Sequence, residues 1–234
     1  MRFAVLPLIV ALAALVPQAA AQDLQRLLKR NSNGTPYRLL VPDNYDGKRS
    51  YPLVIFLHGG GGRGTDNEQQ LGEGNGLLVD LFVTAQKQFP CFVIAPQTAT
   101  RHDAAAVARI VDDVSAGYRV DRTRVYAIGQ SLGGYGIFDL IERDPNLIAA
   151  AVVISADSNA GRVPSARRIP MWFFHGERDS LFPVAGVRRF VAALRAAGDA
   201  VKYTEYSGEG HGLAWLVVRE KGIVPWLFGF TGKP

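Results

Sequence analysis

Residues 129–133 have the types and spacing that activate a serine hydroxyl. Ser131 lies between two glycines in the pattern Gly-x-Ser-x-Gly, after the apolar run 125–128 and before a helical pattern at 134–142. A strand, a sharp turn and a helix in this order form a nucleophile elbow, in which small flanking residues let the chain bend and hold the hydroxyl out beyond the strand. The sequence therefore predicts Ser131 as a nucleophile.

A carboxylate and an imidazole follow later apolar runs, as activation of a serine requires. A free serine hydroxyl is a poor nucleophile at neutral pH, so it needs a base and an acid that orients this base. Asp179 comes shortly after the apolar run 171–174, and His211 lies in a glycine-rich loop after the run 201–206. The chain order serine, carboxylate, histidine is one of the known orders of a catalytic triad. We therefore expect Ser131, Asp179 and His211 to act as nucleophile, acid and base.

The remaining titratable side chains are weaker candidates for the same roles. Asp157 and Glu177 occupy comparable loop positions and stay open as alternative acids. His102 precedes the serine and is expected in a surface loop. His58 and His175 each end a strand in a His-Gly step, where a hydrogen bond that anchors the loop is expected. No histidines have the spacing of a zinc site, so the sequence predicts neither a metal nor a cofactor.

The stretch at 59–64 reads GGGGRG, which fits the Gly-x-Gly-x-x-Gly pattern of a dinucleotide site. A dinucleotide site needs an acidic residue at the end of the next strand, where it holds the ribose. That strand instead ends in Ala-Pro-Gln at 95–97, and the Gly-Lys-Ser/Thr of a phosphate-binding loop is also absent. The pattern therefore does not predict a nucleotide site.

The same glycines suit the stabilisation of an oxyanion. Acyl transfer to a serine needs backbone N–H groups aimed at the developing negative charge, one from this loop and one from the residue after the nucleophile. Leu132 follows the nucleophile, and the loop glycines offer N–H groups without side chains in the way. We expect Gly60 and Leu132 to form the oxyanion hole, with Gly59 or Gly61 as the alternative to Gly60.

The elements that must position these residues alternate between short apolar runs and helical patterns. Strands that are apolar on both faces and are separated by helices form a mostly parallel sheet with helices on both faces. Ligands of such sheets bind beyond the carboxyl ends of the strands, where the candidate residues lie. The expected strands are 37–41, 53–57, 92–95, 125–128, 150–155, 171–174 and 201–206, and the expected helices are 77–87, 104–117 with a cap at Asp103, 134–142, 184–197 and 223–228.

The first residues have the anatomy of a secretory signal peptide. A basic residue precedes an apolar run at 3–16, and small residues stand three and one positions before Gln22. Cleavage is expected near Ala21-Gln22, which makes 1–21 the leader and 22–234 a single domain. The mature protein is then secreted or periplasmic, with no stable membrane anchor.

Composition limits the partners that the chain can have. With 234 residues and 48% apolar content, the chain can bury one sizeable core. Its formal net charge is +5, and the excess Lys and Arg residues are scattered, so no nucleic-acid partner is expected. The single cysteine, Cys91, opens an apolar run and is expected to be a small buried side chain and not a catalytic thiol.

Four segments taken together resemble one group of enzymes. The segments are YPLVIFLHGGGGRGTDNEQQL, VYAIGQSLGGYG, MWFFHGERDSLFPV and YTEYSGEGHG. They resemble secreted α/β-hydrolase esterases of the feruloyl-esterase and polyhydroxybutyrate-depolymerase type, a group that includes relatives described as peptidases or phospholipase/carboxylesterases. The resemblance runs from about Tyr37 to Phe228. It implies the α/β-hydrolase fold without a cap domain.

The resemblance also implies a function. It implies a serine carboxylesterase that works through an acyl-enzyme, on esters linked to plant polymers or on polyesters, with the triad and oxyanion hole described above. Two positions depart from the group. Leu132 stands where relatives often have Met, and residues 212–215 read Gly-Leu-Ala-Trp where an Asp-x-Trp is common. Both departures are expected to reshape the acyl pocket without touching the triad.

Two other function classes share these features. A serine peptidase of the prolyl-oligopeptidase type has the same triad but usually carries an additional gating domain, and a non-catalytic binding module on a hydrolase fold usually lacks a triad residue. The segment 156–170 is too short for a cap, so we expect an open site for small-molecule or polymer-linked esters. Phe182 and Trp215 are expected near it, and Trp172 in the core. The acyl group, the alcohol and the oligomeric state stay open.

Overall fold

The computed structural model describes residues 24–157, 160–166 and 168–232 of the 234-residue chain. The expected signal peptide at 1–21 lies outside the described residues. Within the described ranges, no helix combines the length and the apolar character needed to cross a bilayer.

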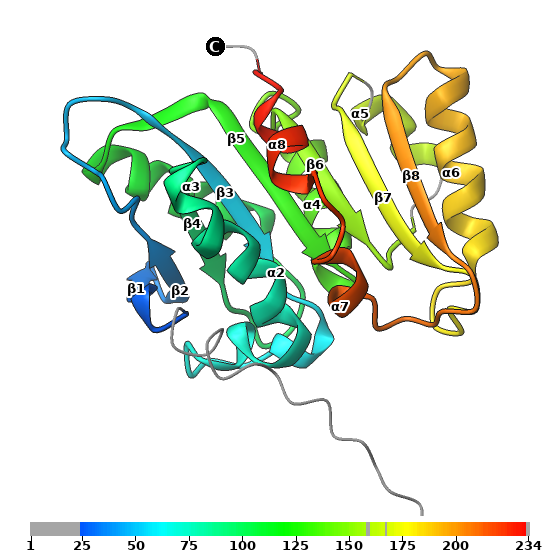
Figure 1. Cartoon of the computed structure of the whole chain (residues 1–234), viewed down its shortest axis with the longest axis horizontal. Helices are drawn as coiled ribbons and strands as arrows, with labels where there is room; N and C mark the ends of the chain where they lie inside the picture. Colours follow the sequence, from blue (N-terminus) through cyan, green and yellow to red (C-terminus); the bar gives the residue numbers. More distant parts are fainter. Residues whose placement is uncertain (1–23, 158–159, 167, 233–234) are drawn as a thin grey trace, which may run out of the picture.

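An eight-stranded sheet forms the centre of the structure (Figure 1). The strand order is β1-β2-β4-β3-β5-β6-β7-β8; β2 is antiparallel to both of its neighbours, and every pair from β4 to β8 is parallel. The expected mostly parallel sheet is therefore confirmed. The strands are β1 (Leu28–Ser32), β2 (Thr35–Leu40), β3 (Tyr51–Leu57), β4 (Phe92–Pro96), β5 (Val120–Gln130), β6 (Ala150–Ile154), β7 (Met171–Gly176) and β8 (Val201–Tyr206).

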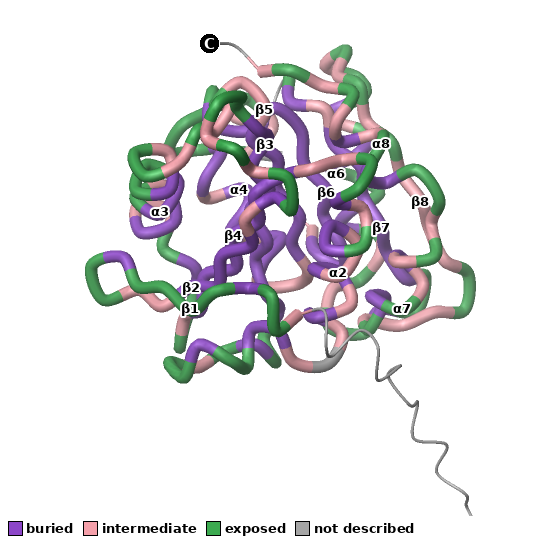
Figure 2. Tube along the Cα trace, turned by 60° about the vertical axis from the view of Figure 1, so that its left-hand side comes forward, coloured by how far each residue is buried: buried purple, intermediate pink, exposed green. Residues whose placement is uncertain are grey.

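The central strands are buried on both faces, which explains their continuous apolar sequences. Every residue of β3, β4, β6 and β7 is buried, and the buried part of the trace gathers in the central strands in Figure 2. Alternate side chains of β3 enter two hydrophobic clusters, with Leu53, Ile55 and Leu57 on one face of the sheet and Val54 and Phe56 on the other. Packing on both faces thus accounts for the apolar residues at consecutive positions of these strands.

Helices cover both faces of the sheet (Figure 1). Buried side chains of α3, α4 and α6 belong to the cluster on one face, and those of α2, α7 and α8 belong to the cluster on the other. Helix α3 has the predicted bounds, because the Asp103 carboxylate caps it by accepting from the Ala105 N–H. The helices are α2 (Glu73–Thr84), α3 (Ala104–Gly117), α4 (Leu132–Arg143), α5 (Val163–Ala166), α6 (Val184–Ala196), α7 (Ala214–Val217) and α8 (Ile223–Phe228), with short 3-10 turns that include η2 (Gly60–Gly62) and η5 (Ala160–Arg162).

Two strands differ from the prediction by more than two residues at an end: β1 was not predicted, and β5 begins earlier than predicted. Strand β1 reads LKRNS and lacks the apolar pattern of a strand, but it pairs along its whole length with β2 at the edge of the sheet. The turn between them places Asn33 and Gly34 at φ 45° and 86°, the left-handed conformation that a two-residue hairpin turn requires. Strand β5 begins at Val120, five residues before the predicted start, because Val120 pairs with Tyr51 of β3. Pairing with a neighbouring strand, and not local hydrophobicity, therefore explains why β1 is a strand and where β5 begins.

Two side chains expected in the interior are confirmed there. Cys91 is a free, fully buried cysteine, and burial raises the pKa of its thiol to about 12, so the thiol is protonated at neutral pH. Trp172 is also buried in β7, and its Nε1 donates to the Thr204 Oγ1 at 3.0 Å. Both residues therefore serve packing.

Candidate active site

Three side chains from loops beyond three strands form a continuous chain of hydrogen bonds. Ser131 follows β5, Asp179 follows β7 and His211 lies in the loop after β8, all at the carboxyl edge of the sheet. Ser131 Oγ and His211 Nε2 are 2.9 Å apart, and His211 Nδ1 and Asp179 Oδ2 are 2.8 Å apart. Because Nδ1 donates to the carboxylate, Nε2 is left to accept a proton from the serine hydroxyl.

The backbone at Ser131 is strained, as in a nucleophile elbow. Ser131 has φ 54° and ψ −113°, a conformation that residues with a side chain rarely adopt. The flanking glycines permit close packing around this turn: a Cβ at Gly133 would lie 1.9 Å from the Leu57 carbonyl oxygen, and a Cβ at Gly129 would lie 2.5 Å from the Gly133 carbonyl carbon. The Gly-x-Ser-x-Gly pattern is therefore a packing requirement of the turn between β5 and α4.

Backbone N–H groups hold the Asp179 carboxylate in one orientation. Asp179 is 4% exposed, and its Oδ1 accepts from the N–H groups of Leu181 and Phe182, both at 2.9 Å. Hydrogen bonds from N–H groups to a carboxylate are among the stronger ones in proteins. They occupy Oδ1 and leave Oδ2 for His211.

His175 anchors the loop that carries this acid. The imidazole of His175 is fully buried, its Nε2 donates to the Phe182 carbonyl oxygen at 2.8 Å, and the same nitrogen lies 3.4 Å from Asp179 Oδ2. The Phe182 ring in turn contacts the His211 ring, with centroids 5.3 Å apart. The prediction that His175 anchors a loop is confirmed, and Phe182 lies at the site as expected.

Ser155 is part of the site although no motif singles it out. Its Oγ donates to the His211 carbonyl oxygen at 2.8 Å, and the residue is buried with φ 48°. Ser155 directly follows β6, so it lies at the same carboxyl edge as the other candidate residues. A polar residue after a buried strand was the signal that could have identified it. Its hydrogen bond holds the backbone of the histidine loop against the sheet.

Replacement of Ser155 by alanine is expected to lower kcat for ester hydrolysis about 2- to 10-fold, because a hydrogen bond with a net value of about 0.5–1.5 kcal/mol that fixes His211 is lost. Steady-state kinetics and thermal melting measure the effect. The matched control is Ser115→Ala, since Ser115 Oγ donates to the Val111 carbonyl oxygen at 2.7 Å within α3, away from the site. Equal kinetic losses in the two variants would contradict a role for Ser155 in the site.

The loop after β3 brings glycine N–H groups beside the serine. A Cβ at Gly59 would lie 3.9 Å from the Ser131 Cβ, so Gly59 lies beside the serine. The Gly59 N–H donates to Asn75 Oδ1 at 3.0 Å and is thereby engaged. Gly60 and Leu132 are the first residues of η2 and α4, and the first N–H groups of a helix have no partner within the helix. The geometry thus favours Gly60 over Gly59 as the donor that pairs with Leu132.

The alternative acids have other partners. Asp157 Oδ1 accepts from the Tyr135 hydroxyl at 2.8 Å, and Glu177 Oε2 accepts from the Ser207 hydroxyl at 2.7 Å and from a backbone N–H of the same loop. Asp179 is the carboxylate that bonds to the histidine. In the part of the chain that the structure describes, no three His, Cys, Asp or Glu side chains gather as a metal site would require.

His102 is buried, which corrects its prediction as a surface loop residue. It is 6% exposed, its Nε2 donates to the His58 carbonyl oxygen at 3.0 Å, and the two imidazole rings are 4.4 Å apart. The space is opened by Gly136 of α4, where a Cβ would lie 3.0 Å from the His102 Cβ. Burial lowers the pKa of His102 to about 3, so its ring is neutral at physiological pH. The burial of His102 could not be predicted from its polar neighbours in the sequence, because the space for its ring is left by Gly136, which is distant along the chain.

The surroundings of the hydrogen-bonded chain are open and partly apolar. Among its described residues, the connection from β6 to β7 contains the short elements η5 and α5. Leu181 is 66% exposed in the loop that carries Asp179, and Trp215 is 44% exposed in α7, just after His211. Apolar side chains therefore border the two loops that carry Asp179 and His211.

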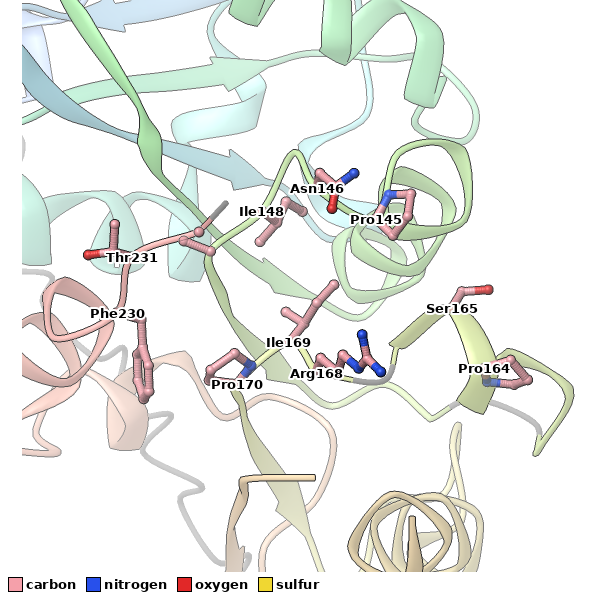
Figure 3. A pocket seen from close by; sticks show the side chains of 12 residues that line it. Pro145, Asn146, Ile148, Pro164, Ser165, Arg168, Ile169, Pro170, Phe230 and Thr231 are labelled. Carbon is pink, nitrogen blue, oxygen red and sulfur yellow. The ribbon is translucent and has the colours of Figure 1, made fainter. Parts of the chain in front are cut away.

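A separate hollow of about 560 Å³ lies at the opposite edge of the sheet (Figure 3). Figure 3 shows its side chains coming from the segments before β6 and β7, from α5 and from the end of the chain. Because these segments meet at the amino ends of the strands, the hollow is remote from Ser131. The lining side chains include Pro145, Asn146, Ile148, Pro164, Ser165, Arg168, Ile169, Pro170, Phe230 and Thr231.

Curated relatives and solved structures resemble this chain over most of its length. A probable feruloyl esterase C of Aspergillus clavatus is 27% identical over 76% of this chain and 70% of its own length, and one of Aspergillus terreus is 25% identical over 67% and 59%. The crystal structure of a thermostable esterase matches with a TM-score of 0.80 and 32% identity over 90% of this chain and 64% of that chain. A feruloyl esterase module of Clostridium thermocellum, complexed with sinapinate, matches with a TM-score of 0.69 and 15% identity over 87% and 88%. The chain therefore spans about 60 to 70% of the first three of these relatives.

A family model identifies the group to which the chain belongs. Residues 34–217, which are more than half of the chain, match the model of the dienelactone hydrolase family. The matched range includes β2 to β8 and the loops that carry Ser131, Asp179 and His211. The TM-score of 0.80 over 90% of this chain shows that the solved thermostable esterase has the same fold. The chain therefore belongs to the dienelactone hydrolase family of ester-hydrolysing enzymes and has their α/β-hydrolase fold.

Proposed function

We propose that this protein is a serine carboxylesterase in which Ser131 is the nucleophile, His211 the base and Asp179 the acid. The observation that carries the proposal is the unbroken chain of hydrogen bonds from Ser131 Oγ through the imidazole to the Asp179 carboxylate, at 2.9 and 2.8 Å. The strained backbone of Ser131, which holds the hydroxyl out beyond β5, supports the same role. Membership of a family of ester-hydrolysing enzymes supports an ester as the substrate.

The proposed reaction has two halves that use the same residues. Ser131 Oγ attacks the ester carbonyl carbon while His211 Nε2 takes the hydroxyl proton, and Asp179 stabilises the imidazolium that forms. The tetrahedral intermediate collapses, the ester C–O bond breaks, and His211 gives the proton to the leaving alcohol. Water then attacks the acyl-enzyme with His211 again as base, which releases the carboxylic acid and restores the serine.

The oxyanion of each tetrahedral intermediate is proposed to bind the N–H groups of Gly60 and Leu132. Both groups lie at the first turn of a helix, beside the serine, and neither has a partner within its own helix. Donors that are held in place before the reaction cost no reorganisation when charge develops. Each such donor typically contributes about 3 to 4 kcal/mol to the lowering of the barrier.

The proposed substrates are small-molecule or polymer-linked esters met outside the cytoplasm. The short connection between β6 and β7 and the exposed Trp215 leave the site accessible to an ester that projects from a larger molecule. The Aspergillus relatives are described as probable feruloyl esterases, which supports aromatic acyl groups on plant polymers as one candidate. The leader at 1–21 supports a secreted or periplasmic enzyme whose single catalytic domain is 22–234.

A panel of chromogenic esters tests this proposal. We expect turnover of acetate, butyrate, ferulate or hydroxybutyrate esters of p-nitrophenol by the full mature chain, and labelling of one site by a fluorophosphonate probe. Peptide p-nitroanilides test the alternative that the protein is a serine peptidase. Faster cleavage of these substrates than of every ester would contradict the esterase proposal and support a peptidase. A correctly folded protein that neither reacts with the probe nor turns over any ester would instead be a binding module.

A further inference from the structure

The backbone N–H and the carbonyl oxygen of Gly59 each form a hydrogen bond with a side chain. Its N–H donates to Asn75 Oδ1 at 3.0 Å, and its carbonyl oxygen accepts from His58 Nδ1 at 2.7 Å and from the Gly62 N–H at 3.0 Å. Asn75 lies in the first turn of α2, sixteen positions along the chain, and is 8% exposed. The backbone of Gly59 is therefore fixed by partners on three sides.

The contacts of the His58 ring determine which of its nitrogens carries the proton. The Thr98 N–H donates to His58 Nε2 at 3.2 Å, so Nε2 is the acceptor nitrogen and the ring proton is on Nδ1, which faces Gly59. Burial lowers the pKa of His58, which keeps the ring neutral with this proton arrangement. The ring also fills the space beside Gly62, where a Cβ would lie 2.7 Å from it. His58 thus holds the Gly59 carbonyl in a fixed direction.

A fixed Gly59 carbonyl also fixes the direction of the next N–H. In a trans peptide the C=O of Gly59 and the N–H of Gly60 point in opposite directions. The carbonyl points to His58 and into η2, so the Gly60 N–H points away from them. Gly59 lies beside the elbow, since a Cβ on it would lie 3.4 Å from the Gln130 carbonyl oxygen and 3.9 Å from the Ser131 Cβ.

We infer that Asn75 is a positioning residue for the oxyanion hole: by accepting the Gly59 N–H, its side chain fixes the His58–Gly59 peptide and, through the Gly59 Cα, the place of the next peptide, which presents the Gly60 N–H to the reacting carbonyl. The inference rests on the proposed esterase function and adds a residue that no catalytic motif contains. Without Asn75, the Gly59 N–H loses its partner in a largely buried place, and the His58–Gly59 peptide rotates to find another. This rotation displaces the Gly59–Gly60 peptide that is bonded to it. A displacement of the donor by about 1 Å is enough to cost about 100-fold in rate.

Asn75→Ala tests this inference in the full mature chain. We expect kcat for p-nitrophenyl butyrate to fall about 10- to 100-fold with KM changed less than about threefold, because the lost interaction acts on the transition state. The Ki of a trifluoromethyl ketone, which forms an oxyanion on the serine, is expected to rise by the same factor as kcat/KM falls. The side chain of serine in Asn75→Ser is too short to reach Gly59, so this variant should show the same changes in kcat and Ki. It replaces the alanine variant in the test if Asn75→Ala does not fold.

Gln86→Ala is the matched control. Gln86 is also a buried amide; its Oε1 accepts the Cys91 N–H at 3.4 Å and its Nε2 donates to the Cys91 carbonyl oxygen at 3.0 Å, just beyond the other end of α2. Its loss should lower the melting temperature and leave kcat and the ketone Ki within about twofold of the wild type.

The outcomes separate the inference from the proposed function. If the wild type hydrolyses esters and the Asn75 variants keep the wild-type kcat and ketone Ki, the positioning role is wrong and the esterase proposal stands. A change confined to KM would also overturn it, because it would mean contact with the substrate and not with the oxyanion loop. A wild type without ester turnover overturns the proposed function itself.

Discussion

Ser131→Ala is expected to lower kcat for p-nitrophenyl acetate by about 10⁴-fold or more and to abolish labelling by a fluorophosphonate probe, because no other hydroxyl lies against His211 Nε2 in the described structure. Binding and the oxyanion donors stay in place, so a small residual rate over the uncatalysed reaction is expected. The strained backbone at position 131 accepts alanine without a new contact, since only Oγ is removed. Stopped assays at high enzyme concentration measure the remaining rate.

Ser207→Ala is the control for this prediction. Ser207 lies on the loop that leads to His211, is exposed, and its hydroxyl donates to Glu177 at 2.7 Å. Its removal should leave kcat within about twofold and the labelling intact, as for most surface substitutions. Retention of more than about one percent of the wild-type kcat in Ser131→Ala would show that another group is the nucleophile.

Asp179→Asn is expected to lower kcat about 10⁴-fold while the fold is kept, a loss of the size seen when the same change is made in other serine triads. The asparagine oxygen can still accept the N–H groups of Leu181 and Phe182, which forces its NH₂ group toward His211. The imidazole must then carry its proton on Nε2, where it cannot accept the proton of the serine hydroxyl. The pH dependence of kcat/KM and a melting curve separate this tautomer effect from misfolding.

Glu177→Gln is the matched test of the alternative acid. Glu177 is two residues from Asp179, but its carboxylate is exposed and bonds to the Ser207 loop. These bonds lower its pKa, so in the folded protein it is ionised at neutral pH without any contact to the histidine. We expect kcat to change less than about threefold in Glu177→Gln. A larger loss of kcat in Glu177→Gln than in Asp179→Asn would show that Glu177, and not Asp179, is the acid of the triad.

Most of the fold follows from local sequence patterns because its central strands are buried on both faces. Continuous apolar runs such as 53–57 and 92–95 mark strands of a parallel sheet, and the strands in the structure contain these runs. A capping aspartate at 103 marked the start of α3, and the helix begins at the next residue. Strand β1 escaped prediction because its five residues carry no apolar alternation, and only pairing with β2 makes it a strand.

Some residues of the candidate site could be predicted from local sequence patterns and others could not. Ser131, Asp179 and His211 were predicted because each follows a strand and because glycines, which mark sharp turns, surround two of them. Their role in catalysis stays a prediction. Ser155 and Asn75 carry no such marks: a serine after a strand and an asparagine in a helix are common, and their partners lie 56 and 16 positions away in the chain.

The sequence by itself determined the fold class, the order of the candidate triad along the chain and the need for glycine at the elbow, since strand burial, turn geometry and backbone strain are local properties. It also predicted Gly60 and Leu132 as the oxyanion donors, with Gly59 or Gly61 as alternatives to Gly60 in a loop of four consecutive glycines. Only the tertiary structure argues against Gly59 as the donor, because Asn75 of α2 engages its N–H. Tertiary packing likewise buried His102 against His58. In both cases the deciding contact joins segments that only the assembled sheet and helices bring together, and no local pattern records it.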